Sequence, residues 1–146
     1  MTPRSLEHAL DSAPAGGGTV EVPRDGGTAE IDLLDVDRLG VRVRGVRVRR
    51  DADVDVATEA ARLPDQLRSL PDRVTPVEVA PSLGGARLRT RPEELRGGEY
   101  FEVDVEPRRT SIRRTRVTED GTREPTDWTL TRDQLERLID EAAGPR

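Results

Sequence analysis

The sequence predicts an α+β protein built on antiparallel strands, with a helix near each end and a helical segment in the middle. Three observations predict this class. Short segments alternate apolar and charged residues, which is typical of strands that bury one face. Clusters of Gly and Pro separate these segments, as turns do between hairpin strands. Three other segments space apolar residues as a helix with one buried side does. We therefore expect antiparallel meander sheet packing, with the C-terminal helix on the sheet.

The length of 146 residues fits one domain spanning 1–146. Hydrophobic residues make up 33% of the chain, and Trp, Tyr and Phe occur once each. The core is therefore expected to be thin and rich in Val and Leu. A candidate internal boundary lies near residues 71–76, which Pro71 and Pro76 frame.

The first half of the chain is expected to contain one helix followed by three strands. Ser5 can cap a helix over residues 6–13. The alternation of apolar residues changes parity at Leu34 and again at Gly45, and a β-bulge at each position would explain both shifts. A hairpin that turns at Gly45 is the alternative. The strands are expected at 20–22, 29–36 and 41–49.

The second half is expected to begin with a helical segment over 55–70, which Pro64 splits into two short helices. Thr131 and Gln134 form a capping-box pattern at the start of a C-terminal helix. The apolar face of that helix, with Leu135 and Leu138, is expected to lie against the sheet. The intervening strands are expected at 77–79, 86–90, 101–106, 110–117 and 123–130.

Several classes of chemistry are excluded by composition. Without Lys or Cys, the chain has no P-loop lysine, Schiff-base lysine, thiol nucleophile or disulfide. The single His8 has no second His with which to hold a metal, and it is expected on a solvated helix face. We therefore predict no catalytic residue and no cofactor. The net charge of −5 argues against nucleic-acid binding, because a net cationic footprint is missing.

No metal site is predicted, although Asp51, Asp53 and Asp55 repeat the first ligand spacings of a calcium-binding EF-hand loop. Val56 stands where that loop needs Gly, and Arg62 stands where it needs a bidentate Glu. A solvated loop that leads into a helix is the better interpretation. No signal-like or membrane-spanning apolar run is seen, so we expect a cytoplasmic protein without membrane contact.

Acids and arginines are expected to face each other across the ladders of the sheet, because strands that are consecutive in the chain usually pair. The main interpretation is a self-neutralised face exposed to solvent. The alternative is that unpaired arginines bind an anionic partner. Arg108 and Arg109 lie in a turn and are therefore the predicted partner-binding residues. The acidic strand positions are Glu30, Asp32, Glu78, Glu102, Asp104 and Glu106, and the arginine positions are 42, 44, 47, 49, 87, 89, 91, 113, 114 and 116.

These observations favour a non-catalytic protein-binding, adaptor or accessory protein, either chaperone-like or of the inhibitor type. Its partner is expected to be another protein, and a homodimer is compatible with the sequence. The order of helix, three strands, helix, more strands and helix resembles that of bacterial secretion-chaperone-like domains, in element order only. The alternatives are a regulator that binds an anionic ligand through arginines, and an enzyme that uses carboxylate and arginine chemistry.

Overall fold

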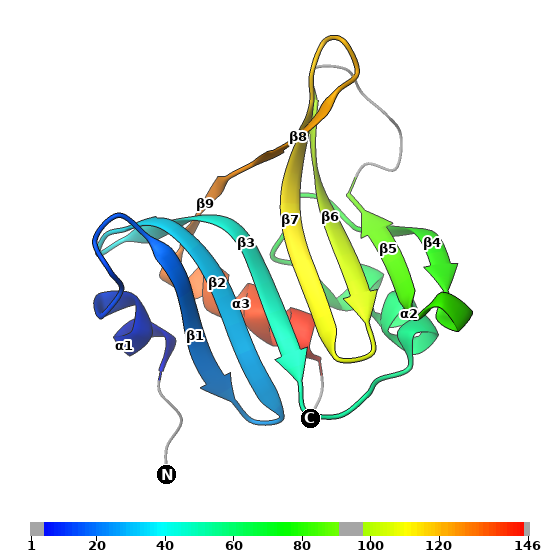
Figure 1. Cartoon of the computed structure of the whole chain (residues 1–146), viewed down its shortest axis with the longest axis horizontal. Coiled ribbons are helices and arrows are strands. Elements are labelled where there is room, and N and C mark those ends of the chain that lie inside the picture. Colours follow the sequence, from blue (N-terminus) through cyan, green and yellow to red (C-terminus); the bar gives the residue numbers. More distant parts are fainter. Residues whose placement is uncertain (1–4, 91–97, 145–146) are drawn as a thin grey trace.

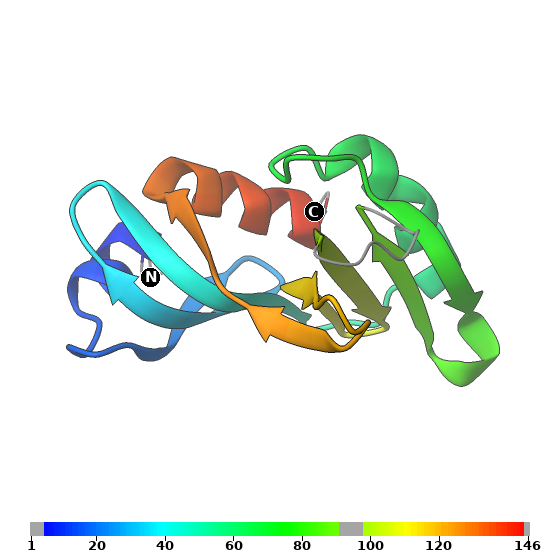
Figure 2. The same cartoon turned by 90° about the horizontal axis from the view of Figure 1, so that it is seen from above.

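The computed structural model describes residues 5–90 and 98–144. In this part of the chain, nine strands form one antiparallel sheet, and three α-helices cover one of its faces (Figures 1 and 2). The predicted fold class is therefore confirmed. The elements are α1 (Leu6–Asp11), β1 (Gly18–Arg24), β2 (Gly27–Val36), β3 (Gly40–Arg50), α2 (Val56–Gln66), β4 (Thr75–Ala80), the 3₁₀ turn η1 (Pro81–Leu83), β5 (Gly85–Arg89), β6 (Glu99–Glu106), β7 (Arg109–Val117), β8 (Arg123–Thr126), β9 (Trp128–Thr131) and α3 (Arg132–Ala143).

The strands have the order β1-β2-β3-β7-β6-β5-β4 across the sheet, so β3 lies beside β7 rather than beside β4. The end of β3 pairs with the start of β7, and the start of β3 pairs with β9. The end of β7 pairs with β8. Strands β3 and β7 therefore diverge along their length, and the β8–β9 segment passes between them from one to the other (Figure 1).

This crossing corrects the prediction of one continuous strand over 123–130. The strand is interrupted at Asp127, between β8 and β9. The carboxylate of Asp127 accepts two hydrogen bonds from the Arg42 guanidinium of β3, at 3.0 and 2.9 Å. The break is caused by the change of partner strand, which the local pattern of apolar residues does not encode.

The β2–β3 ladder contains both predicted bulges. Asp32 pairs with Gly45, Leu33 with Val43 and Asp35 with Arg42, so Arg44 and Leu34 are each left out of the register. Because one extra residue lies on each strand, the two bulges compensate and the ladder continues in register on both sides. Strand β3 therefore runs through Gly45, and the alternative hairpin is wrong.

The central helix differs from its prediction. Helix α2 is one helix with Pro64 inside its last turns, and no second helix comes after it before β4 within the described residues. Beyond α2, the backbone N–H groups of Arg68 and Ser69 donate to one carboxylate oxygen of Glu141 on α3, at 3.1 and 2.9 Å. This side chain takes the place of the helical acceptors that a second helix would have provided.

One hydrophobic core fills the space between the sheet and the helices, and most of it is Val and Leu. Helix α1 packs on β1, α2 on β4, β5 and β6, and α3 on β3, β9 and α2. Leu135 and Leu138 of α3 are fully buried, as predicted. Residues 67–74 join α2 to β4, so segment 71–76 covers the end of this connection and the first two residues of β4. The sheet continues from the first half of the chain into the second through the β3–β7 ladder.

The predicted capping box of α3 is present. The Thr131 hydroxyl accepts from the backbone N–H of Gln134 at 3.0 Å, and the Gln134 side chain accepts from the Thr131 N–H at 2.9 Å. We expect Thr131→Ala to lower the free energy of unfolding by about 0.5–2 kcal/mol, because one N–H at the helix start loses its acceptor. Chemical denaturation measures this loss. Thr131→Ser keeps the cap and should retain most of the stability; an equal loss in both variants would contradict the capping role.

Candidate functional site: the charged face of the sheet

The face of the sheet that carries no helix is covered by charged side chains, and we call it the outer face. Opposite charges meet across four ladders: Glu30 faces Arg47, Glu78 faces Arg87, and Glu102 faces both Arg89 and Arg113. The predicted pairing of acids with arginines is therefore confirmed at these positions. Arg91, one of the predicted arginines, lies outside the described residues.

The strand order adds a feature that the chain order does not show. Two arginine-bearing strands, β3 and β7, lie side by side in the middle of the outer face, with the acidic strands β2 and β6 on either side. Arg49 of β3 is directly opposite Arg109 of β7, and Arg47 is opposite Ser111. The outer face thus has a central cationic seam, formed by Arg47 and Arg49 of β3 and Arg109 and Arg113 of β7.

Glu102 on β6 pairs with three arginines of this face, Arg87, Arg89 and Arg113. Only 6% of its side chain is exposed. The Arg89 Nε donates to the Oε2 of Glu102 at 2.8 Å, and the Arg113 Nη2 donates to the Oε1. The Arg87 Nε lies 3.6 Å from the same Oε1. Burial on its own would raise the pKa of Glu102, but the hydrogen bonds from Arg113 and Arg89 outweigh it, so the pKa lies below its usual value. Glu102 is therefore held as a carboxylate.

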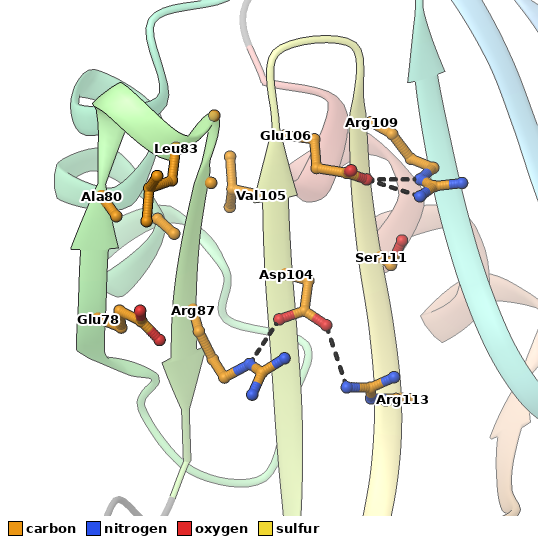
Figure 3. A pocket seen from close by; sticks show the side chains of 13 residues that line it. Glu78, Ala80, Leu83, Arg87, Asp104, Val105, Glu106, Arg109, Ser111 and Arg113 are labelled. Atoms are coloured by element: carbon orange, nitrogen blue, oxygen red, sulfur yellow. Dashed lines mark hydrogen bonds and ion pairs between the residues drawn. The ribbon is translucent and has the colours of Figure 1, made fainter.

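Asp104, two residues further along β6, extends the network. It accepts from the Arg87 Nε at 2.8 Å and lies 3.1 Å from the Arg113 Nη2 (Figure 3). The pKa of Arg87 is raised, chiefly by its hydrogen bond to Asp104. Glu102, with its lowered pKa, and Arg87, with its raised pKa, thus stay charged at neutral pH. Such groups suit recognition by charge and hydrogen bonding better than proton transfer, which needs a pKa near the working pH.

A depression of about 470 Å³ lies over these residues. Its floor is formed by β5, β6 and β7, and the β4–η1 segment forms one wall, from which Leu83 projects (Figure 3). Both signs of charge line it, together with small and apolar side chains. The lining residues are Glu78, Ala80, Leu83, Gly84, Gly85, Ala86, Arg87, Asp104, Val105, Glu106, Arg109, Ser111 and Arg113.

The two predicted partner-binding residues occupy different places. Arg109 is the first residue of β7 and not part of the turn, so its predicted position is wrong. It lines the depression, and its guanidinium binds Glu106 at 2.7 Å. Arg108 lies in the turn before β7, and its Nε donates to Asp53 at 2.8 Å. The expectation that both arginines are unpaired is therefore wrong, because carboxylates of neighbouring segments reach both of them. Their role in binding a partner stays a prediction.

Two of the three aspartates that resemble the start of an EF-hand loop, Asp53 and Asp55, have structural partners. Asp55 caps α2 by accepting from the Thr58 N–H at 3.2 Å, and Asp53 pairs with Arg108. His8 is exposed on α1. Within residues 5–90 and 98–144, no three His, Cys, Asp or Glu side chains form a group that could hold a metal ion. None of the helices in those residues has the length and apolar character needed to cross a membrane.

The fold and the site together define a two-layer α+β protein with an open, charged sheet face. No match to this chain is found among protein-family models, curated proteins or solved structures. Its function must therefore be argued from the residues of the outer face themselves.

Proposed function

We propose that this protein is a non-catalytic binding protein whose outer face receives a segment of another protein in the depression beside η1. The observation that carries this proposal is the position of the exposed apolar side chains. Four large hydrophobic residues are exposed in the described part of the chain, and one of them, Leu83 of η1, lines the depression. Val77 and Val79 are on the adjoining strand β4 but lie outside that lining. Exposed apolar groups beside a polar rim are typical of protein-binding surfaces.

The outer face is a better candidate than the edges of the sheet. Strand β4, at one end, contains Pro76 and a register irregularity between Pro76 and Glu78. Strand β1, at the other end, contains Pro23. Proline and bulges on edge strands hinder pairing with a further strand. The prolines and the register irregularity therefore disfavour both edge-to-edge homodimers and the addition of a strand from a partner. The depression and its apolar wall are left as the candidate surface for a partner.

The chemistry of the depression indicates what kind of segment fits. Leu83, which is 84% exposed, offers an apolar contact at one wall. Arg109 and Arg113, about half exposed, offer guanidinium groups at the opposite side. A partner segment with an apolar side chain followed by an acidic one would satisfy both walls. Arginine and apolar anchors of this kind often dominate binding energy at protein interfaces.

We expect Leu83→Asp to weaken binding of the partner at least tenfold, because a charge replaces the apolar contact. Leu39→Asp is a matched control, since Leu39 is 82% exposed and lies in the β2–β3 turn, away from the depression. The measurement is quantitative pull-down from the source cells with mass spectrometry, accompanied by thermal melts. Both variants should have the melting temperature of the wild type. The proposed binding surface would be wrong if both variants lost the partner equally, or if Leu83→Asp still bound the partner as the wild type does.

Arg108 and Arg109 give a second comparison in the same experiment. Arg109→Ala is expected to weaken binding of the partner more than Arg108→Ala does. Arg109 lines the depression, whereas Arg108 pairs with Asp53 outside it. Neither substitution should change the melting temperature much, because an exposed ion pair contributes at most about 1 kcal/mol. A larger loss of partner binding in Arg108→Ala than in Arg109→Ala would indicate that the partner binds at the turn and not in the depression.

A further inference from the structure

The cationic seam between β3 and β7 contains two arginines that lie directly opposite each other. Arg49 and Arg109 are direct partners in the ladder. Their chain neighbours Val48 and Thr110 are buried, so both arginine side chains project onto the outer face. Like charges on residues that are directly opposite each other in a ladder are destabilising. A bound anion shared by the two guanidinium groups would relieve this repulsion.

Both arginines have hydrogen-bond donors available. The guanidinium of Arg49 makes no hydrogen bond to any of the described residues, and its side chain is 59% exposed. Its nearest carboxylate oxygen, on Glu30, is 3.6 Å from Nη1. Arg109 uses Nε and Nη2 to bind one oxygen of Glu106, at 2.9 and 2.7 Å. Its remaining nitrogen points away from Glu106, toward β3 (Figure 3).

Ser111 supplies a neutral donor next to this pair. It lies two residues after Arg109 on β7, so both side chains are on the same face. Its hydroxyl makes no hydrogen bond within the described part of the chain, and it lines the depression. Across the ladder it faces Arg47, whose guanidinium is held by Asp32 at 2.6 and 2.9 Å. Arg47 adds positive charge but few free donors.

We propose that Arg49, Arg109 and Ser111 form a binding site for a phosphate group. A phosphate carries several acceptor oxygens arranged tetrahedrally, so it can accept from two guanidinium groups and a hydroxyl at once. A single carboxylate has two oxygens in one plane, which one guanidinium satisfies. The source of the phosphate is either free inorganic phosphate or a phosphorylated side chain of a partner. The inference does not depend on the protein-binding role proposed above.

The site has a built-in competitor, which gives the proposal a distinctive test. Glu106 holds Arg109 from the β6 side, so an incoming phosphate must compete with this carboxylate for the same guanidinium. Glu106→Gln removes the competing charge and the repulsion between it and the anion. This variant is therefore expected to bind phosphate more tightly than the wild type, by about three- to tenfold.

The experiment is a titration of the full-length protein with inorganic phosphate at constant ionic strength, monitored by NMR or calorimetry. The wild type should show saturable binding. Arg49→Gln and Arg109→Gln should each raise the Kd about tenfold or more, through loss of a charge-assisted hydrogen bond. Arg116→Gln is the matched control: Arg116 is also on β7 and also exposed, but it lies on the other face and pairs with Glu124. It should leave the Kd unchanged.

A phosphoserine peptide and its unphosphorylated form distinguish the two sources. Tighter binding of the phosphopeptide than of inorganic phosphate, lost in Arg49→Gln, would identify a phosphorylated partner; equal binding would identify the free anion. Leu83→Asp should leave phosphate binding unchanged, so failure of the protein-binding proposal would not affect this result. The phosphate site is overturned if the wild type does not saturate, if Arg116→Gln weakens binding as much as Arg49→Gln does, or if Glu106→Gln fails to tighten it.

Discussion

Leu138→Ala is expected to lower the free energy of unfolding by about 2–5 kcal/mol. Leu138 is fully buried on the face of α3 that packs against β3 and β9, together with Leu135 and Ile139. Truncation removes apolar contacts and leaves a cavity that the rigid sheet beneath can close only in part. The loss should be large in relation to the total stability, because domains of this size are stable by only about 5–15 kcal/mol.

Arg137→Ala is the matched control for this prediction, since Arg137 is exposed and adjacent to Leu138 on the same helix. It should shift the free energy of unfolding by no more than about 0.5 kcal/mol. Urea denaturation of both variants, monitored by circular dichroism, measures the difference. If Leu138→Ala unfolds at the wild-type midpoint, α3 is not docked on the sheet in solution.

The sequence is sufficient to predict local elements wherever a short-range signal exists. Thr131 with Gln134 marks the start of α3, and the parity changes at Leu34 and Gly45 mark two bulges, because each signal lies within a few residues of the feature that it causes. Pro64 is a weaker signal: a proline near the end of a helix removes one hydrogen bond, and α2 continues past it. The path of the chain beyond α2 depends on Glu141, which is distant in the sequence.

The strand order is the part that the sequence does not predict. Acids and arginines on consecutive strands indicate pairing between neighbours in the chain, and β2–β3, β5–β6 and β6–β7 obey this rule. Nothing local indicates that β3 pairs with β7, so the opposition of Arg49 and Arg109 becomes visible only in three dimensions. For the same reason, the alternating pattern of β6 predicts that Glu102 is exposed, whereas arginines from both neighbouring strands enclose it.

Glu102→Gln is expected to lower the free energy of unfolding by about 2–4 kcal/mol at neutral pH. This loss is near the lower end of the cost of breaking a buried ion pair, because the arginines that lose their partner can still reach water. Arg89 is the most affected partner: its side chain is only 15% exposed, and its guanidinium lies over the Tyr100 ring, 5.4 Å from the ring centroid. Glu106→Gln, on the same strand, removes an exposed pair and should cost less than about 1 kcal/mol.

Comparison of Glu102→Gln with the wild type also tests the charge state of Glu102. Its pKa is lower in the folded protein than in the unfolded chain, because the hydrogen bonds from Arg113 and Arg89 outweigh the effect of burial. The folded state therefore binds fewer protons, so the contribution of Glu102 to stability is complete above the unfolded pKa of about 4.3 and is lost as the pH falls through the lower folded pKa.

Denaturation should therefore show that the difference in stability between wild type and Glu102→Gln is constant above about pH 5 and shrinks at lower pH, because the Glu102 carboxylate of the wild type becomes protonated. Asp32, whose pKa is lowered mainly by its hydrogen bond to Arg47, also makes the wild type sensitive to acid. It does so equally in the variant, so the difference between the two proteins isolates Glu102. A difference that stays the same down to pH 3, or that grows as acid is added, would show that the carboxylate is not held charged by its arginines.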